Sequence, residues 1–328
     1  IVSGHGSGGK LMQQIIADVI KKELGDSTIQ LDDSAIVHIS TENVAFTTDT
    51  FTIFPLEFPG GDIGSLAING TVNDLAVMGA TPLYLSCSLI IEEGLDIQFL
   101  IKVLKSMKRE ADSAGVKIVT GDTKVVQKGA ADKIFINTSG IGVLNKTARQ
   151  PIEDGDVIIV SGTLADHGMT IMSQRNDLSF GQNLKSDCAH LNHLINKVID
   201  HCFDSIKFMR DPTRGGVASV LNELVFNTEL SAEVFEDEVP VNPEVKGVCD
   251  ILGIDPLYVA NEGKVLFIVK KNEENKVLEK IREDNLGKDA KIIGVLHKRN
   301  SGKVFLKTSI GGKRLLPLLV DDQLPRIC

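Results

Sequence analysis

The spacing of hydrophobic residues predicts strands and helices in both halves of the chain. Continuous or alternating apolar runs between polar and glycine-rich segments indicate strands, and apolar residues at helical spacing indicate helices. In the first half, we expect strands at residues 35–39, 44–48, 83–91, 116–120 and 134–144, and helices at 62–78 and 96–114. In the second half, the pattern predicts strands at 157–161, 265–270, 291–297 and 304–307, and helices at 189–203, 216–226 and 273–284.

A polar break at residues 145–151 separates the two halves. Each half mixes helices with several neighbouring strands, which favours an α+β fold over a doubly wound parallel sheet. A length of 328 residues is enough for two hydrophobic cores of ordinary size. We therefore expect an N-terminal domain at residues 1–148, a C-terminal domain at 149–310 and a mobile tail at 311–328.

The composition narrows the class of protein. Hydrophobic residues make up 42% and charged residues 24% of the chain, as in globular proteins. No apolar stretch is long enough to span a bilayer, and the glycine-rich start lacks the features of a signal peptide, so we expect a cytoplasmic protein without a membrane anchor. A net charge of −9, two tyrosines and no tryptophan argue against nucleic-acid binding. A polyanionic ligand would therefore need a local site, with a metal to neutralise it.

Aspartates recur where predicted strands give way to loops. Asp32 and Asp33 precede one strand, Asp49 and Asp122 each follow another, and Asp74 lies in the segment 69–80. A carboxylate at the end of a strand is held by a fixed backbone, and oxygen ligands are those that Mg²⁺ prefers beside nucleotide phosphates. Each aspartate taken alone is better explained as a turn former or a helix cap. Taken together, the set favours a metal–nucleotide site.

Three further polar clusters could serve a phosphate-bearing ligand. The opening segment 4–10 has the glycine spacing of a P-loop before Lys10, but Leu11 replaces the Mg²⁺-binding hydroxyl and no strand precedes it. A glycine-rich flap that carries Lys10 is the better interpretation, with an unstructured terminus as the alternative. The segment 211–216, with Asp211 and Arg214, stands directly before a predicted helix, where backbone N–H groups can bind phosphate. Asn261, Glu262 and Gly263 form the third cluster, for which a simple turn is the alternative.

The chain ends in a cysteine, Cys328, after Pro325, Arg326 and Ile327. Because chain ends move unless something holds them, a terminal thiol suits an arm that carries a group between sites. An incidental solvated cysteine is the alternative. The other four cysteines are widely spaced, form no CxxC pair and are expected to be free thiols in a reducing compartment.

The order of these motifs resembles the aminoimidazole ribonucleotide synthetase superfamily, also called PurM-like, over essentially the whole chain. Within it, the opening GHGSGGK and the terminal PRIC are similar to the HypE family of hydrogenase maturation proteins. The segments that carry the resemblance are 4–10, 32–35, 47–49, 69–80 (NGTVNDLAVMGA), 121–124 (GDTK), 211–216 (DPTRGG), 261–263 (NEG) and the tail.

The resemblance implies a two-domain PurM-like protein, a homodimer, that dehydrates its own C-terminus with ATP and Mg²⁺. In that family, the carbamoyltransferase HypF places a carbamoyl group on the terminal thiol, here Cys328. ATP then converts the thiocarbamate to a thiocyanate, and cyanide passes to iron on a HypC–HypD scaffold for nickel–iron hydrogenase.

The resemblance also implies roles for individual residues. Asp33, Asp74 and Asp211 are expected at the metals. Lys124 and Glu262 are candidates for proton transfer, and Lys10 is a candidate to close over the phosphates. The nucleotide site is expected to include Asp33, Asp49, Asn69, Asp74, Gly121, Asp122, Thr123 and Arg214.

Two alternatives stay open at this point. A sister synthetase of the selenophosphate or aminoimidazole ribonucleotide type would share the ATP site and would not need Cys328. A non-enzymatic thiol carrier would bind nucleotide only as a switch.

Overall fold

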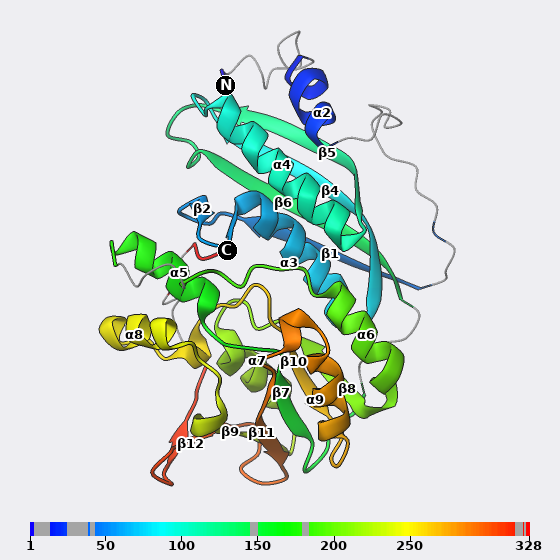
Figure 1. Ribbon diagram of the computed structural model, residues 1–328, viewed down its shortest axis with the longest axis vertical. Helices are drawn as coiled ribbons and strands as arrows, with labels where there is room; N and C mark the ends of the chain where they lie inside the picture. The colour runs from blue at the N-terminus through cyan, green and yellow to red at the C-terminus, as the bar shows by residue number, and fades with distance from the viewer. Residues whose placement is uncertain are drawn as a thin grey trace.

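The computed structural model describes residues 1–2, 14–24, 39, 43–144, 150–178, 184–318, 324 and 326–328. These residues form two mixed α/β units, one built on a four-stranded sheet and the other on a seven-stranded sheet (Figure 1). The two units pack against each other, since helix α3 of the first contacts helix α6 and strand β8 of the second. The α+β architecture predicted from the sequence is confirmed.

The first sheet has the strand order β1-β6-β4-β5. Its strands are β1 (Val44–Phe51), β4 (Ala80–Glu92), β5 (Lys117–Val126) and β6 (Ile134–Leu144). Among the described strands of this sheet, β4 and β5 are parallel and the other neighbouring pairs are antiparallel. Helices α3 (Ile63–Val77) and α4 (Ile97–Ala114) cover one face, and the small hairpin β2 (Glu57–Phe58) and β3 (Gly61–Asp62) leads into α3. A short π-helix η2 (Ile16–Ile20) and helix α2 (Lys21–Leu24) pack near α4.

Helix α3 lies at the centre of the molecule. Asp62 caps its N-terminus, because the Asp62 carboxylate accepts the backbone N–H of Ser65 at 2.9 Å while the Ser65 hydroxyl accepts that of Asp62. Nearly every residue of α3 is buried, since the sheet, α4 and the second unit surround it. Polar residues on this helix are therefore held at the junction of the two units.

None of the described helices covers the opposite face of the first sheet. Strand residues alternate between the two faces, so alternate side chains of all four strands point away from α3 and α4. Phe46 is 69% exposed on this face, and Val44 and Ile90 are exposed beside polar residues. This bare surface is called the open face below.

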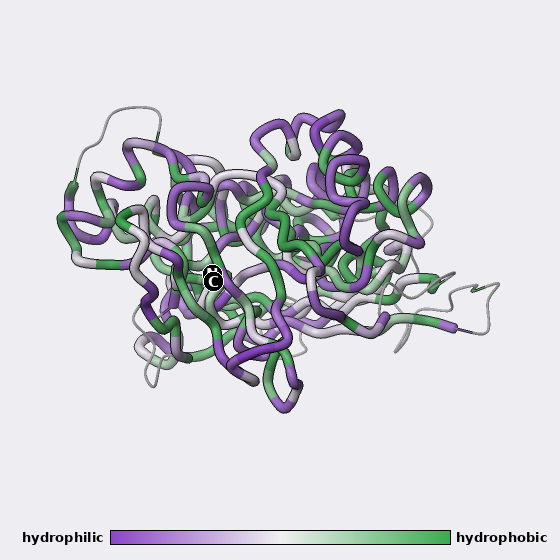
Figure 2. Tube along the Cα trace, turned by 90° about the horizontal axis from the view of Figure 1, so that it is seen from below, coloured by the Kyte–Doolittle hydropathy of each residue, from purple (hydrophilic) through white to green (hydrophobic). Residues whose placement is uncertain are grey.

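The second sheet has the order β13-β12-β9-β11-β7-β10-β8. Its strands are β7 (Val157–Val160), β8 (Ile206–Arg210), β9 (Ser231–Phe235), β10 (Leu266–Val269), β11 (Lys291–His297), β12 (Val304–Lys307) and β13 (Lys313–Leu315). Helices α5 (Asp166–Arg175), α6 (Asn192–Cys202), α7 (Gly216–Val225), α8 (Pro243–Leu252) and α9 (Glu274–Arg282) surround it. Short 3₁₀ turns are η3 (Phe203–Ser205), η4 (Glu236–Glu238), η5 (Pro256–Tyr258) and η6 (Asn285–Gly287). The central strands β7 and β10 are buried along their whole length. Hydrophobic stretches run through the interior of the molecule, and hydrophilic ones are more frequent at its periphery (Figure 2).

Most of the predicted helices and strands are present. Helices α3, α4, α6, α7 and α9 and strands β4, β6, β7 and β10 to β12 agree with the expected ranges to within three residues. Strands β1 and β5 run three and six residues beyond their expected ends, so Asp49 and Asp122 lie within strands and not in the loops after them. The predicted strand at 35–39 lies outside the described residues apart from residue 39. Strands β8, β9 and β13 and helices α5 and α8 were not predicted.

The expected tail contains ordered structure. Strand β13 pairs with β12, and Leu316 beyond it is buried, so residues 313–316 extend the second sheet. The tip of the chain is docked between the two units (Figure 1). The domain boundaries at 148 and 310 stay predictions. Across the parts of the chain that the structure describes, no helix combines the length and apolar character needed to cross a membrane.

Candidate active site

Two predicted site aspartates meet on the covered face of the first sheet. Asp49 lies on β1 and Asp74 lies on α3. The Thr47 hydroxyl donates a hydrogen bond of 2.7 Å to the Asp74 carboxylate. Burial and the charge of Asp74 raise the pKa of Asp49 to about 7, against the opposing effects of Arg214 and Thr71. The two carboxylates therefore repel each other in the structure as it stands.

The second unit contributes Asp211 and Arg214 to the same place. Asp211 follows β8 and is buried, and burial together with the charges of Asp74 and Asp49 raises its pKa to about 7. The segment 211–216 then turns tightly into α7. Gly216 has φ +59°, and a Cβ there would lie 2.6 Å from the backbone oxygen of Leu257, so this turn needs glycine. The tight turn explains the glycine pair, and it places the Arg214 guanidinium within electrostatic reach of Asp49.

Glu262 borders this carboxylate group. Its side chain is only 3% exposed, and among the described residues its Oε1 has no hydrogen-bond partner. Burial and the charges of Asp187, Asp211 and Asp49 raise its pKa well above the ordinary value, and Arg214 opposes the shift. A buried carboxyl with a free oxygen and a raised pKa is suited to proton transfer once a ligand neutralises the neighbouring charges.

The segment around Glu262 is held firmly by its neighbours. The Asn261 amide donates to the Pro212 carbonyl at 3.0 Å, and its oxygen accepts the Ala165 backbone N–H at 2.8 Å. The Asn73 amide on α3 donates to the Glu262 carbonyl at 3.2 Å. The simple turn considered for residues 261–263 therefore does not account for them, because these bonds join both units.

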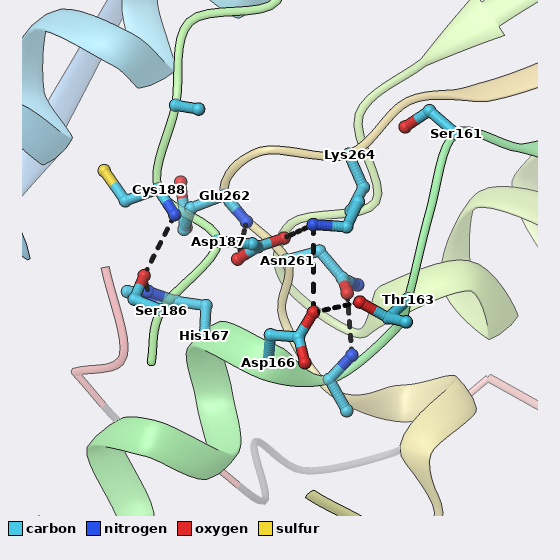
Figure 3. Close-up of polar contacts among 12 residues, drawn as sticks. Ser161, Thr163, Asp166, His167, Ser186, Asp187, Cys188, Asn261, Glu262 and Lys264 are labelled. Atoms are coloured by element: carbon cyan, nitrogen blue, oxygen red, sulfur yellow. Dashed lines mark hydrogen bonds and ion pairs between the residues drawn. The ribbon is translucent and has the colours of Figure 1, made fainter. Parts of the chain in front are cut away.

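A buried ionic network next to Glu262 was not predicted. Lys264 lies between Asp187, at 3.1 Å, and Asp166, at 3.8 Å, and all three side chains are nearly inaccessible (Figure 3). The Asp187 carboxylate also accepts the backbone N–H of Glu262 at 3.1 Å. Lys264 directly follows the 261–263 cluster in the sequence, which is a weak signal, whereas Asp166 and Asp187 stand in unrelated segments.

The end of the chain lies beside this site. The backbone N–H of Thr52 donates to the backbone oxygen of Cys328 at 3.1 Å, and that of Phe54 donates to the Arg326 carbonyl at 3.3 Å. Arg326 itself forms an ion pair with Asp132 at 2.8 Å. Thr52 lies three residues beyond Asp49, a distance of about 10 Å along an extended chain. The carboxy-terminal residue is thus docked just beyond the end of β1, the strand that carries Asp49.

The predicted residues on β5 lie apart from Asp49 on β1 within one chain. Gly121, Asp122, Thr123 and Lys124 lie on the edge strand opposite β1, three strand spacings or about 14 Å away. Thr123 is buried on the helix-covered face. Asp122 and Lys124 are exposed and point to the open face, where they pair in register with Ser88 and Ile90.

The remaining predicted residues divide between α3 and segments that are not described. Asn69 is buried on α3, with Nδ2 3.5 Å from the Cys188 Sγ, and its Oδ1 has no partner among the described residues. Lys10 and Asp33 lie outside the described residues, as does the glycine-rich opening segment.

The carboxylates have the chemistry of a Mg²⁺ site, since Asp49, Asp74 and Asp211 offer hard oxygen ligands whose mutual repulsion a cation would relieve. Within the described ranges, no group of three or more His, Cys, Asp or Glu side chains has the arrangement of a complete metal site. A metal bound here would need additional ligands, such as the phosphates of a nucleotide.

Comparison with known proteins decides the family. Residues 31–144 match the N-terminal domain of AIR synthase related proteins, and residues 153–307 match the C-terminal domain. Carbamoyl dehydratase HypE of Escherichia coli strain K12 is 45% identical over 99% of this chain and 98% of its own length. The chain belongs to the HypE family. The expected resemblance to HypE and to the PurM-like superfamily is therefore confirmed.

Solved HypE structures agree with this assignment. A HypE structure in complex with ATP has a TM-score of 0.94 and 43% identity, and the match covers 100% of this chain and 99% of the other. A HypE–HypF complex matches with a TM-score of 0.80 and 43% identity, over 96% and 100% of the two chains. These relatives favour the HypE activity over that of the sister synthetases and over a passive thiol carrier.

Proposed function

We propose that this chain is an ATP-dependent carbamoyl dehydratase that acts on its own C-terminal cysteine during nickel–iron hydrogenase maturation. The S-carbamoyl group on Cys328 becomes a thiocyanate, and its cyanide is then donated to iron. The observation that carries the proposal is the docking of the Cys328 residue at the end of β1, near Asp49 and between the two units. An incidental, solvated terminal cysteine would not be expected to form these hydrogen bonds between the two units.

The reaction needs ATP because an amide oxygen is a poor leaving group. In the first step, the carbamoyl oxygen attacks the γ-phosphorus of ATP, ADP leaves, and one N–H proton is lost. In the second step, the remaining N–H proton is lost, the C–O bond breaks and phosphate departs with the former carbamoyl oxygen. The product is R–S–C≡N, and the balance is one ATP consumed, with ADP and phosphate formed. Phosphoryl transfer of this kind depends mainly on positioning and on neutralising charge.

The site residues divide between proton transfer and charge stabilisation. Glu262 acts as the base at the carbamoyl nitrogen, since its free, buried oxygen can take a proton once cations offset its neighbours. Arg214 faces the carboxylates and neutralises part of the phosphate charge. Lys124 serves either as a second base or as a cation on the developing charge, and Lys10 closes over the phosphates.

Mg²⁺ is proposed as the metal partner of ATP. Asp74, Asp211 and Asp33 would hold it, together with Asp49, whose repulsion with Asp74 marks it as a further ligand. When bound, Mg²⁺ neutralises the phosphate charge that develops during transfer. Asp122, Thr123, Gly121 and Asn69 are assigned to the nucleotide.

The arrangement of the site supports a homodimer. Asp49 and Asp74 lie on the covered face of the first sheet, whereas Asp122 and Lys124 lie on its open face at the far edge. Among the described residues, one chain therefore does not bring these four side chains to the same face. The open face also leaves Phe46, Val44 and Ile90 exposed, and a second copy packed on it would cover them and lie against Asp122 and Lys124.

Mixing two inactive variants tests this arrangement. Lys124→Ala and Asp74→Asn each remove one side of every site, so each homodimer is expected to be inactive. If each site takes Asp74 from one chain and Lys124 from the other, random mixing gives half heterodimers, each with one intact site. Activity should then return to about a quarter of the wild-type value, as expected when each interface site is shared by two chains. No recovery after demonstrated subunit exchange would contradict a shared site.

The proposed partners follow from the same reaction. HypF, which is named in the matched HypE–HypF complex, would carbamoylate Cys328. A HypC–HypD complex would receive the cyanide at its iron. We propose a cytoplasmic location for the exchange.

The dehydratase is tested by intact-protein mass spectrometry after carbamoylation by HypF. The adduct should map to Cys328 and should lose the mass of one water only with hydrolysable ATP and Mg²⁺. A Cys328→Ala variant provides the control for the site of modification. A carbamoyl adduct that persists in the presence of Mg-ATP would reject the dehydratase in favour of a passive thiol carrier.

A further inference from the structure

His167 contacts the tail directly and has no role in the function argued so far. The imidazole lies in α5 and is 0% exposed. Its Nε2 is 2.8 Å from the carbonyl oxygen of Ile327, the residue before Cys328. Its Nδ1 is 2.8 Å from the Ser186 hydroxyl, and the ring of Phe58 packs edge-on against it at 5.4 Å.

These contacts fix which nitrogen carries the proton. A carbonyl oxygen can only accept, so Nε2 must be the N–H donor to Ile327. Burial lowers the pKa of His167, which keeps the ring neutral, so Nδ1 accepts from the Ser186 hydroxyl. The Ser186 oxygen in turn accepts the backbone N–H of Cys188 at 3.1 Å. In this series of hydrogen bonds both ring nitrogens and the Ser186 hydroxyl have partners, which leaves His167 one tautomer while the tail is docked.

The same segment fixes Glu262. Ser186, Asp187 and Cys188 are consecutive, and Asp187 accepts the backbone N–H of Glu262 at 3.1 Å (Figure 3). Gly263 packs so tightly on this segment that a Cβ would lie 1.8 Å from the Asp187 backbone oxygen. Movement of residues 186–188 must therefore move the backbone of Glu262.

We propose that His167 is a positioning residue for the reaction, which holds the peptide unit that leads into Cys328 and couples tail docking to the placement of Glu262 through residues 186–188. The inference rests on the proposed dehydratase. His167 touches the Ile327 carbonyl and not the thiol, so it orients the tail and takes no part in the proton transfers. A histidine that only filled the core would have no need of a partner in the last residues of the chain.

Three variants test the proposal. His167→Phe keeps an aromatic ring and removes both nitrogens, whereas His167→Gln keeps an N–H donor on a flexible side chain. His193→Phe is the matched control, because His193 lies on α6 and bonds to the Ser113 carbonyl at 2.9 Å, away from the tail. All variants are compared as the full-length, HypF-carbamoylated protein.

Two readouts separate positioning from a merely structural role. The first is hydrogen exchange at the amides of Thr52 and Phe54, which donate to Cys328 and Arg326 only while the tail is docked. The second is the single-turnover rate of water loss from the Cys328 adduct, measured at saturating Mg-ATP. For His167→Phe we expect exchange about tenfold faster and water loss about tenfold slower, the effect of one lost hydrogen bond in a buried site. We expect partial rescue in His167→Gln, and neither change in the His193→Phe control.

The outcomes are distinct. Wild-type exchange and wild-type turnover in a folded His167→Phe protein would overturn the positioning role. If His167→Phe fails to fold, Ser186→Ala provides the same test, since it keeps the imidazole and removes the hydroxyl that sets its tautomer. Absence of water loss in the wild type would instead reject the proposed dehydratase, and the exchange rates of Thr52 and Phe54 would still decide whether His167 holds the tail.

Discussion

Removing the charge of Asp211 should stabilise the free protein while it weakens ATP binding. Asp211 is buried, and its pKa is raised from 3.8 to about 7 by burial and by the charges of Asp74 and Asp49. Between about pH 4 and pH 7, Asp211 therefore keeps its proton in the folded chain, whereas it has lost it in the unfolded chain. The free energy of unfolding falls as the pH rises from about 4 to about 7, and the full cost is present above pH 7.

The size of the effect follows from the two pKa values. Each tenfold change in an ionisation constant equals about 1.4 kcal/mol, so ionised Asp211 costs about 4 kcal/mol above pH 7. About 3 kcal/mol of this cost appears between pH 5 and pH 8. Asp211→Asn has nearly the same shape and does not ionise, so it removes this cost, and it also relieves the neighbouring Asp49. For a chain of this length, 3 kcal/mol corresponds to a rise in melting temperature of about 4 °C.

The assay is thermal melting of the nucleotide-free protein at several pH values from 5 to 8. The difference in melting temperature between Asp211→Asn and wild type should grow with pH by several degrees in favour of the variant. Asp237→Asn provides the control, because Asp237 is exposed and its replacement should give no such trend. Saturating Mg-ATP should reverse the order, since only the wild type then gains from bound ligand. A melting difference between Asp211→Asn and wild type that does not change with pH would refute the reasoning.

Three further predictions test the site. Because metal ligation requires ionised carboxylates, Mg-ATP binding should release protons at pH 6, where Asp49 and Asp211 are largely protonated, and few at pH 8. Titration calorimetry in buffers of different ionisation enthalpy would measure the number of protons released. Equal release at both pH values would contradict the prediction. Glu262→Gln should slow single-turnover water loss by about 10²-fold or more, the usual effect of losing a general base, with ATP affinity within about threefold of wild type, and an unchanged rate would exclude Glu262 as the base. Gly263→Ala should lower both stability and turnover, because its Cβ would collide with the Asp187 backbone oxygen. In Gly312→Ala the Cβ would meet only the Thr308 hydroxyl at 3.1 Å, so this control should melt and turn over as the wild type does.

Local sequence patterns were sufficient where an element has a distinct apolar face or an apolar core strand. Helix α4 shows this, with its buried stripe and its Asp96 cap, and so does β7, a short run of buried residues. Helix α5 was missed because most of its first two turns are buried by tertiary contacts, including its polar Asp166 and His167, so no amphipathic stripe is visible. Strand β13 was missed because its three residues are exposed and are defined only by pairing with β12.

The candidate site also contains residues that could be predicted from local motifs and residues that could not. Asp49, Asp74, Asp211 and Glu262 could be singled out as candidates, since each stands in a compact motif, and their charges affect one another in the structure; their roles stay predictions. Asp187 and Lys264 could not, because they act as a buried pair whose members are 77 positions apart. That Lys124 lies on the opposite sheet face from Asp49 could not be predicted either. Face and register depend on strand pairing, which a single sequence does not reveal.

The central claim is that ATP phosphorylates the carbamoyl oxygen on Cys328. The most direct test uses a carbamoyl group labelled with a heavy oxygen isotope and follows the label by mass spectrometry of the released phosphate. The account predicts one labelled oxygen in each phosphate, in step with thiocyanate formation at Cys328. Unlabelled phosphate, with the label lost to water or kept on the protein, would contradict it.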